Sequence, residues 1–191
     1  MHRYFKFIII ISVIFGTLYA NGVQFSKENI AVTILTQSMI EIRGEYFFTS
    51  KNSDTTFSDL FYPFPLDSSS LYPCYISVKK IRDVDELPFT KNERGIYFPV
   101  EVHRGDTTGI LIIYRQQVKN QSGTYILTTT NFWGNPLYYS SYSVCVPQTL
   151  NLDFLSYECD SVKVNGKKVI YTFFKKRFMP DRDLFFRWSK R

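Results

Sequence analysis

The sequence contains few of the residues on which enzymes and metal sites commonly depend. The 191-residue chain has three cysteines and two histidines, and His103 is the only histidine after residue 20. It contains no Cys-x-x-Cys pair, no Gly-x-Ser-x-Gly nucleophile motif and no glycine-rich phosphate loop. We therefore predict no catalytic residues, no metal ligands and no cofactor. A hydrolase that uses His103 is the weakest hypothesis, because no motif places a nucleophile beside it.

Long helical periodicity is also missing after residue 20, and strand patterns take its place. In Ile40–Phe48, the apolar side chains alternate with Glu41, Arg43 and Glu45, which is typical of a half-buried strand. The pattern predicts an all-β fold, an antiparallel β-sandwich of about ten to twelve short strands with one short helix at most. Two packed sub-sandwiches are an alternative arrangement.

Two hairpins are expected from local sequence. The Asn165-Gly166 pair predicts a tight turn that joins Val162–Val164 to Lys168–Phe174. Gly109–Gln117 has Ile and Leu at both parities, which indicates a central strand buried on both faces. We expect it to pair with Thr124–Thr130.

The N-terminal segment, residues 1–20, has the pattern of a secretory signal peptide. A short basic head precedes the apolar run Phe7–Phe15, and Ala20 supplies a small residue at the end. The apolar run is shorter than the roughly 20 residues of a membrane span. We expect a bacterial protein that is secreted or periplasmic, and contact with the membrane only if the segment remains as an uncleaved anchor.

The charge is mildly basic and dispersed. The chain carries 23 Lys and Arg against 17 Asp and Glu, a formal net charge of +6, and loss of Arg3 and Lys6 with the leader would lower this to +4. Such a distribution does not indicate a nucleic-acid partner. An anionic envelope surface or polysaccharide remains a candidate partner.

The cysteines leave two readings open. One disulfide between Cys145 and Cys159 would close a short loop and leave Cys74 as a free thiol. Equally, all three could be buried reduced thiols, because a free cysteine packs as a small apolar side chain.

Aromatic residues are abundant: 18% of the chain is Phe, Trp or Tyr, including 18 Phe and 14 Tyr. Such side chains fill β cores, and they also favour binding surfaces. Phe132, Trp133, Tyr138 and Tyr139 flank a turn and are the candidate binding residues, as an aromatic platform for a glycan or a partner chain. In the alternative, Trp133 plugs the end of the sandwich.

Five short segments in the first half carry a family resemblance. The segments Gly44–Phe48, Tyr62–Leu66 and Tyr97–Val102, followed by Arg104–Thr107 and Gly109–Tyr114, resemble the vault/inter-α-trypsin (VIT) domain over residues 30–130. Similar exported bacterial β-sandwich domains share this pattern. The resemblance implies a β-sandwich that serves interaction or scaffolding and brings no catalytic residues.

These observations predict three segments and a function. Residues 1–20 are the signal peptide, residues 21–130 a VIT-like β-sandwich, and residues 131–191 a C-terminal β extension or second sheet. The first hypothesis is a non-enzymatic exported protein that binds another protein or an envelope component, through the aromatic residues or through an exposed strand edge. The alternative is a carbohydrate-binding module that uses the aromatic platform.

Overall fold

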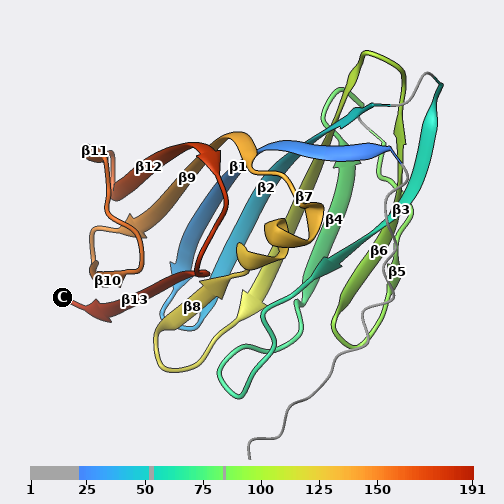
Figure 1. The fold of residues 1–191 in the computed structure, drawn as a ribbon. Helices are drawn as coiled ribbons and strands as arrows, with labels where there is room; N and C mark the ends of the chain where they lie inside the picture. Colours follow the sequence, from blue (N-terminus) through green and yellow to red (C-terminus); the bar gives the residue numbers. More distant parts are fainter. Residues whose placement is uncertain (1–21, 52–53, 84) are drawn as a thin grey trace, which may run out of the picture.

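The computed structural model describes residues 22–51, 54–83 and 85–191, and the predicted signal peptide lies outside them. The described chain forms thirteen strands and one short 3₁₀ helix, η1 (Figure 1). The elements are β1 (Val23–Thr36), β2 (Met39–Ser50), β3 (Thr56–Pro63), β4 (Tyr75–Lys80), β5 (Thr90–Lys91), β6 (Gly95–Val102), β7 (Thr107–Gln117), β8 (Ser122–Tyr125), η1 (Thr128–Trp133), β9 (Leu137–Pro147), β10 (Leu150–Leu155), β11 (Ser161–Asn165), β12 (Lys168–Phe178) and β13 (Leu184–Lys190).

The largest sheet has seven strands in the order β11-β12-β9-β1-β2-β7-β4. Neighbouring strands of this sheet run antiparallel, except β1 and β9, which run parallel. The predicted all-β fold is confirmed, although the sheet is mixed rather than purely antiparallel. Residues 131–191 supply β9, β11 and β12 to this sheet, so they extend the sheet that the first half begins.

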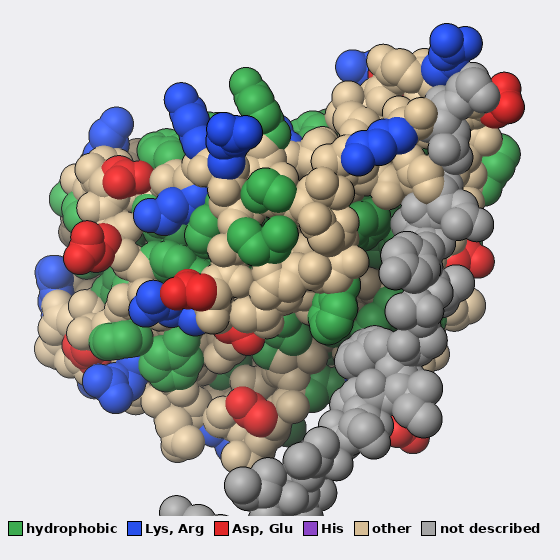
Figure 2. Space-filling model, viewed as in Figure 1, with side chains coloured by type: hydrophobic (Ala, Val, Ile, Leu, Met, Phe, Trp, Pro, Cys, Tyr) green, Lys and Arg blue, Asp and Glu red, His purple; other side chains and the backbone are tan. Residues whose placement is uncertain are grey.

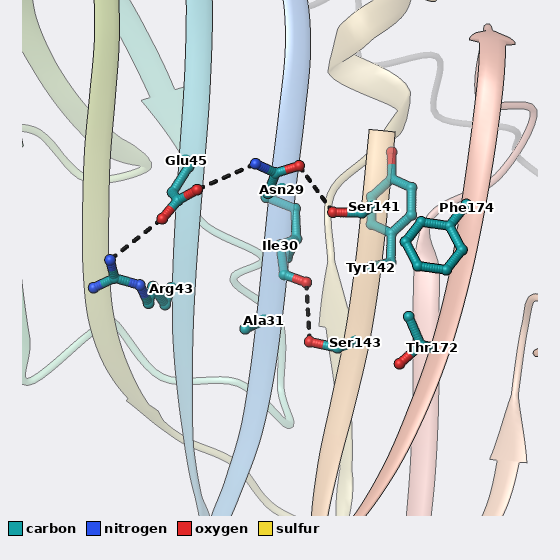
Figure 3. A pocket seen from close by; sticks show the side chains of 10 residues that line it. All are labelled: Asn29, Ile30, Ala31, Arg43, Glu45, Ser141, Tyr142, Ser143, Thr172 and Phe174. Atoms are coloured by element: carbon teal, nitrogen blue, oxygen red, sulfur yellow. Dashed lines mark hydrogen bonds and ion pairs between the residues drawn. The ribbon is translucent and has the colours of Figure 1, made fainter. Parts of the chain in front are cut away.

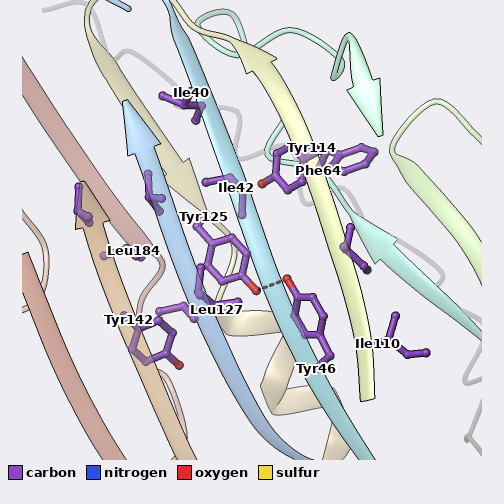
Figure 4. Packing of buried hydrophobic residues seen from close by; sticks show 14 of the residues in the cluster. Ile40, Ile42, Tyr46, Phe64, Ile110, Tyr114, Tyr125, Leu127, Tyr142 and Leu184 are labelled. Atoms are coloured by element: carbon purple, nitrogen blue, oxygen red, sulfur yellow. Dashed lines mark hydrogen bonds between the residues drawn. The ribbon is translucent and has the colours of Figure 1, made fainter. Parts of the chain in front are cut away.

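Two three-stranded sheets, β10-β13-β8 and β3-β6-β5, complete the fold. Their apolar side chains join those of the large sheet in one buried cluster, part of which is shown in Figure 4. We call the face of the large sheet that covers this cluster the inner face, and the opposite one the outer face. Leu184 of β13 and Val100 of β6 both belong to the cluster, so a single core connects all three sheets.

The alternation predicted for Ile40–Phe48 is confirmed. Ile40, Ile42, Tyr46 and Phe48 are buried on the inner face, while Glu41, Arg43 and Glu45 are half-buried or exposed. In β7 the inner face is likewise buried, but Leu111 and Ile113 on the outer face are only half-buried. Gly109–Gln117 is therefore a central strand that is fully buried on one face rather than on both.

Of the two expected hairpins, one is present and one is wrong. β11 and β12 pair through Asn165 and Lys168, so the turn residues are Gly166 and Lys167, one position later than expected. Gly166 has φ of 57°, which glycine adopts without steric cost. By contrast, β7 pairs with β2 and β4, and β8 pairs with β13. Part of the expected partner strand, Thr124–Thr130, instead enters η1.

All three cysteines are free thiols, so the structure contains no Cys145–Cys159 disulfide and corrects that reading. Cys145 pairs with Ile170 on one side of β12, whereas Asp160, next to Cys159, donates its backbone N–H to Thr172 O on the other side. Strands lie about 4.8 Å apart. Two such spacings exceed the roughly 7 Å between Cα atoms that a disulfide can span.

We predict that residues 131–191 unfold together with the rest of the described chain. Phe173 of β12 is fully buried, and its ring stacks on Tyr142 with centroids 4.6 Å apart. Phe173→Ala should lower the free energy of unfolding by about 3–5 kcal/mol in a single urea transition. The neighbouring Phe174 is 46% exposed on the other face, so Phe174→Ala should cost under about 1 kcal/mol. Two separate transitions, of which Phe173→Ala moves only one, would contradict the prediction.

Candidate binding surface

The outer face of the large sheet is a broad surface that no described segment buries over β1, β2, β9 and β12. Every outward side chain of these four strands is half-buried or exposed, in contrast to the inner face. Strand register arranges these side chains in rows that cross the strands. The row order is the same from β2 through β1 and β9 to β12.

Three consecutive rows form the centre of this surface. The first row is Phe47, Lys27, Tyr139 and Lys176; the second is Glu45, Asn29, Ser141 and Phe174; the third is Arg43, Ala31, Ser143 and Thr172. Glu45 and Phe174 stand at the ends of the second row and Arg43 at one end of the third, whereas short side chains occupy the positions between them. The surface is therefore hollowed at its centre.

The hollow has a volume of about 250 Å³ and is open to solvent. Figure 3 shows that its polar lining is joined by hydrogen bonds across three strands. Arg43 Nη2 donates to Glu45 Oε1 at 3.3 Å, and Asn29 Nδ2 donates to Glu45 Oε2 at 3.1 Å. Ser141 Oγ in turn donates to Asn29 Oδ1 at 2.8 Å. The network fixes the side-chain amide of Asn29 at the floor of the hollow.

Aromatic rings border the hollow along the first and second rows. Lys27 Nζ lies 4.9 Å from the centroid of the Phe47 ring and 5.5 Å from that of Tyr139. The Tyr139 and Phe174 rings have centroids 6.3 Å apart. A ligand in the hollow would meet amide and hydroxyl groups below and aromatic rings at the side.

A second polar cluster lies inside the core, around Glu28. Tyr142 Oη donates to Glu28 Oε1 at 2.6 Å, and Tyr125 Oη donates to Glu28 Oε2 at 3.3 Å. The hydroxyls of Tyr46 and Tyr125 lie 2.9 Å apart (Figure 4), and those of Tyr62 and Tyr46 lie 2.8 Å apart. When Glu28 is ionised, Tyr125 gives its only hydroxyl proton to the carboxylate, and Tyr46 then donates to Tyr125. The chain of hydroxyls joins strands of all three sheets.

Burial dominates the ionisation of this carboxyl group. Glu28 is 2% exposed, and desolvation raises its pKa from 4.5 to about 7, although the hydrogen bonds from Tyr142 and Tyr125 oppose the shift. Desolvation also raises the pKa of Tyr46 and of Tyr125, with the charge of Glu28 as the next cause. The tyrosines therefore remain protonated donors. Glu28, Tyr46, Tyr125 and Tyr142 are buried, so the cluster belongs to the core, and Tyr142 also lines the hollow.

The structure packs Trp133 against the core. Its ring lies 5.7 Å from those of Phe25 and Phe48 on the inner face. Asp183 Oδ1 accepts hydrogen bonds from the backbone N–H and the hydroxyl of Thr128, at 2.9 Å and 2.8 Å, which fastens the start of η1. The half-buried Trp133 thus packs in the manner of the core-plug alternative.

Of the other three candidate binding residues, Tyr139 lies on the opposite face of the large sheet from Trp133. Phe132 is 75% exposed and Tyr138 is 80% exposed, whereas Tyr139 is half-buried on the outer face. Since Trp133 and Tyr139 lie on opposite faces of the large sheet, the four residues do not form one platform. The aromatic platform is therefore corrected, and Tyr139 alone belongs to the hollow's surroundings.

Sequence reasoning missed the polar residues of the hollow, Asn29, Arg43, Ser141 and Thr172. The available signal was the alternation of Asn29 and its outward neighbours with buried apolar residues along β1. The alternation shows that Asn29 points to the outer face. It does not show which residues lie beside Asn29, because neither β1 nor β9 alone indicates that the two strands pair.

His103 is an exposed residue just after β6. His103 Nδ1 lies 2.9 Å from Thr55 Oγ1, and its Nε2 lies 3.6 Å from Glu101 Oε1. Among residues 22–51, 54–83 and 85–191, no three His, Cys, Asp or Glu side chains are grouped to hold a metal ion. The same residues include no helix long and apolar enough to cross a membrane.

Comparison with known proteins identifies the fold alone. No family model matches the chain, for the VIT domain or any other family, and no curated protein matches it. A "putative nutrient binding protein" from Legionella pneumophila has a similar structure, with a TM-score of 0.69 at 11% identity over 87% of this chain and 67% of that one. An M1 zinc metallopeptidase from Deinococcus radiodurans matches with a TM-score of 0.52 at 8% identity, over 87% of this chain.

The lengths of these structures differ from that of the chain. The match covers 42% of the peptidase, so the chain spans less than half of its length. What the chain shares with both structures is a β-rich domain fold. The activity of the whole peptidase does not transfer to a chain at this identity.

The buried carboxyl group of Glu28 should make stability depend on pH. Between pH 4.5 and about 7 the folded protein retains a proton that the unfolded chain has released, so rising pH favours unfolding. This group should therefore lower the free energy of unfolding by about 3 kcal/mol across that window, with little further change above it. Glu28→Gln should abolish this loss in urea titrations between pH 4 and 8.

The matched control is Glu93→Gln, which alters an exposed carboxyl group. It should keep the pH profile of the unmodified protein. If Glu28→Gln loses as much stability as the unmodified protein when the pH rises, the loss does not come from ionisation of a buried Glu28, and the prediction is wrong.

Proposed function

We propose that the protein is a non-enzymatic, exported bacterial module that binds a component of the cell envelope through the outer face of its seven-stranded sheet. The observation that carries the proposal is the organised but uncovered surface over β1, β2, β9 and β12. Export is inferred from the signal-peptide pattern of residues 1–20.

The outer face has the composition of a surface that contacts another molecule. Its centre combines a fixed hydrogen-bond network, from Arg43 through Glu45 and Asn29 to Ser141, with the rings of Tyr139 and Phe174. Aromatic rings beside a polar network provide contact area at little entropic cost while the network sets specificity.

The comparisons are consistent with a binding role and do not demand one. The "putative nutrient binding protein" has the same fold, and that description belongs to the Legionella protein. The similarity to that protein supports a binding module, and the chemistry of the outer face suggests which component it binds.

We predict that filling the hollow weakens attachment to the envelope. Ala31 is a small residue of the third row that lines the hollow, and a large side chain there would project into the space. In co-sedimentation with envelope fragments from the producing organism, Ala31→Trp should weaken binding at least about tenfold, equivalent to about 1.4 kcal/mol.

Thr90→Trp is the matched control, because Thr90 is exposed on β5 of a small sheet away from the outer face. It should bind like the unmodified protein. Thermal unfolding of both variants checks that each remains folded. Equal loss in both variants, or no sedimentation of the unmodified protein, would contradict the proposed function.

A further inference from the structure

The outer face divides into two halves of different charge. On the half formed by β2, β7 and β4, the cations are paired: Arg43 with Glu45 at 3.3 Å, Arg115 with Glu41 at 2.7 Å and Lys79 with Glu86 at 3.8 Å. These pairs leave little net charge on that half. It offers no free cation of the described residues to an anionic ligand.

The other half, formed by β1, β9, β12 and β11, is basic. Register places Lys27, Lys163, Lys168 and Lys176 on the outer face, and the described residues give none of the four a salt bridge. Lys163, Lys168 and Lys176 are exposed, and Lys27 is half-buried beneath its cation–π contacts. Several basic side chains are visible near the edge where β11 and β12 lie (Figure 2).

These lysines lie at the two ends of the hollow. Lys27 and Lys176 belong to the first row, whereas Lys163 and Lys168 lie beyond the third row. Lys168 and Lys176 are eight residues apart on one strand, about 27 Å at the usual rise. Between them lie the hydroxyls of Ser143 and Thr172 and the ring of Phe174.

From this arrangement we propose that the ligand of the outer face is an acidic polysaccharide, a chain of sugars that carry carboxylate groups. Carboxylates at intervals along the chain would meet the lysines, while sugar rings would pack on Phe174 and Tyr139. Hydroxyl and amide groups of the hollow would exchange hydrogen bonds with sugar hydroxyls. This inference deepens the proposed function and rests on it.

The centre between the lysines favours a saccharide over a polymer without sugar rings, because the rings of Tyr139 and Phe174 lie beside the hydroxyls of Ser143 and Thr172. Lysine is a point charge on a flexible stem and pairs with anionic groups at varied spacings. The four cations that register places on the outer face of this half are lysines, and the one arginine at the hollow, Arg43, is already bonded to Glu45. Flexible point charges around a polar, aromatic centre match carboxylates spaced along a saccharide.

The test uses polygalacturonate as the acidic probe and dextran as the neutral one, with immobilised protein at 150 mM salt. Polygalacturonate should bind and dextran should not. Lys168→Gln combined with Lys176→Gln should weaken polygalacturonate binding at least tenfold, and Phe174→Ala should weaken it about fivefold. The charge-matched control, Lys91→Gln with Lys119→Gln, removes two exposed cations that lie outside the outer face and should change binding less than twofold.

Equal losses in the two double variants would show that only net charge matters and would overturn the proposal. The proposal would also be overturned if the protein bound vesicles of phosphatidylglycerol through Lys168 and Lys176 and did not bind polygalacturonate. If envelope fragments bind and polygalacturonate does not, the acidic polysaccharide is wrong while the proposed function stands. If envelope fragments do not bind, the proposed function fails first.

Discussion

The parallel pairing of β1 with β9 is the interaction on which both polar clusters depend. It places Asn29 beside Ser141 on the outer face and brings Tyr142 to Glu28 on the inner face. It also joins the strands of residues 131–191 to those of the first half in one sheet. Without this pairing, the large sheet would separate into two pieces, and the hollow would lose one wall.

The carboxyl group of Glu28 shows how a buried polar residue is tolerated in this core. Removing a carboxylate from water is costly, and partial pairing would not offset that cost. Hydrogen bonds from Tyr142 and Tyr125, with Tyr46 and Tyr62 behind them, satisfy the group through a single chain. Since the members come from three sheets, the chain also favours one relative placement of those sheets over others.

Local sequence predicted strands well and their partners poorly. The alternation in Ile40–Phe48 reflects burial of one face of the strand, and this pattern is visible in the sequence of the strand alone. The partner of Gly109–Gln117 is instead chosen by contacts with β2 and β4, so adjacency in sequence to Thr124–Thr130 was misleading. Tyr139 was found because it is aromatic. Asn29 and Ser141 were not, because only the fold brings these ordinary polar residues together.

The central position of β1 has a consequence for the order in which the protein folds. Its hairpin partner β2 follows after a short turn, so that pair can form as soon as residues 23–50 are available. Its other partner, β9, ends more than a hundred residues later. Until then β1 presents an unpaired strand edge, which is a known route to aggregation. The edge of β1 is therefore the part of the first half that most needs the later strands, and it stays open longest when the chain is made slowly.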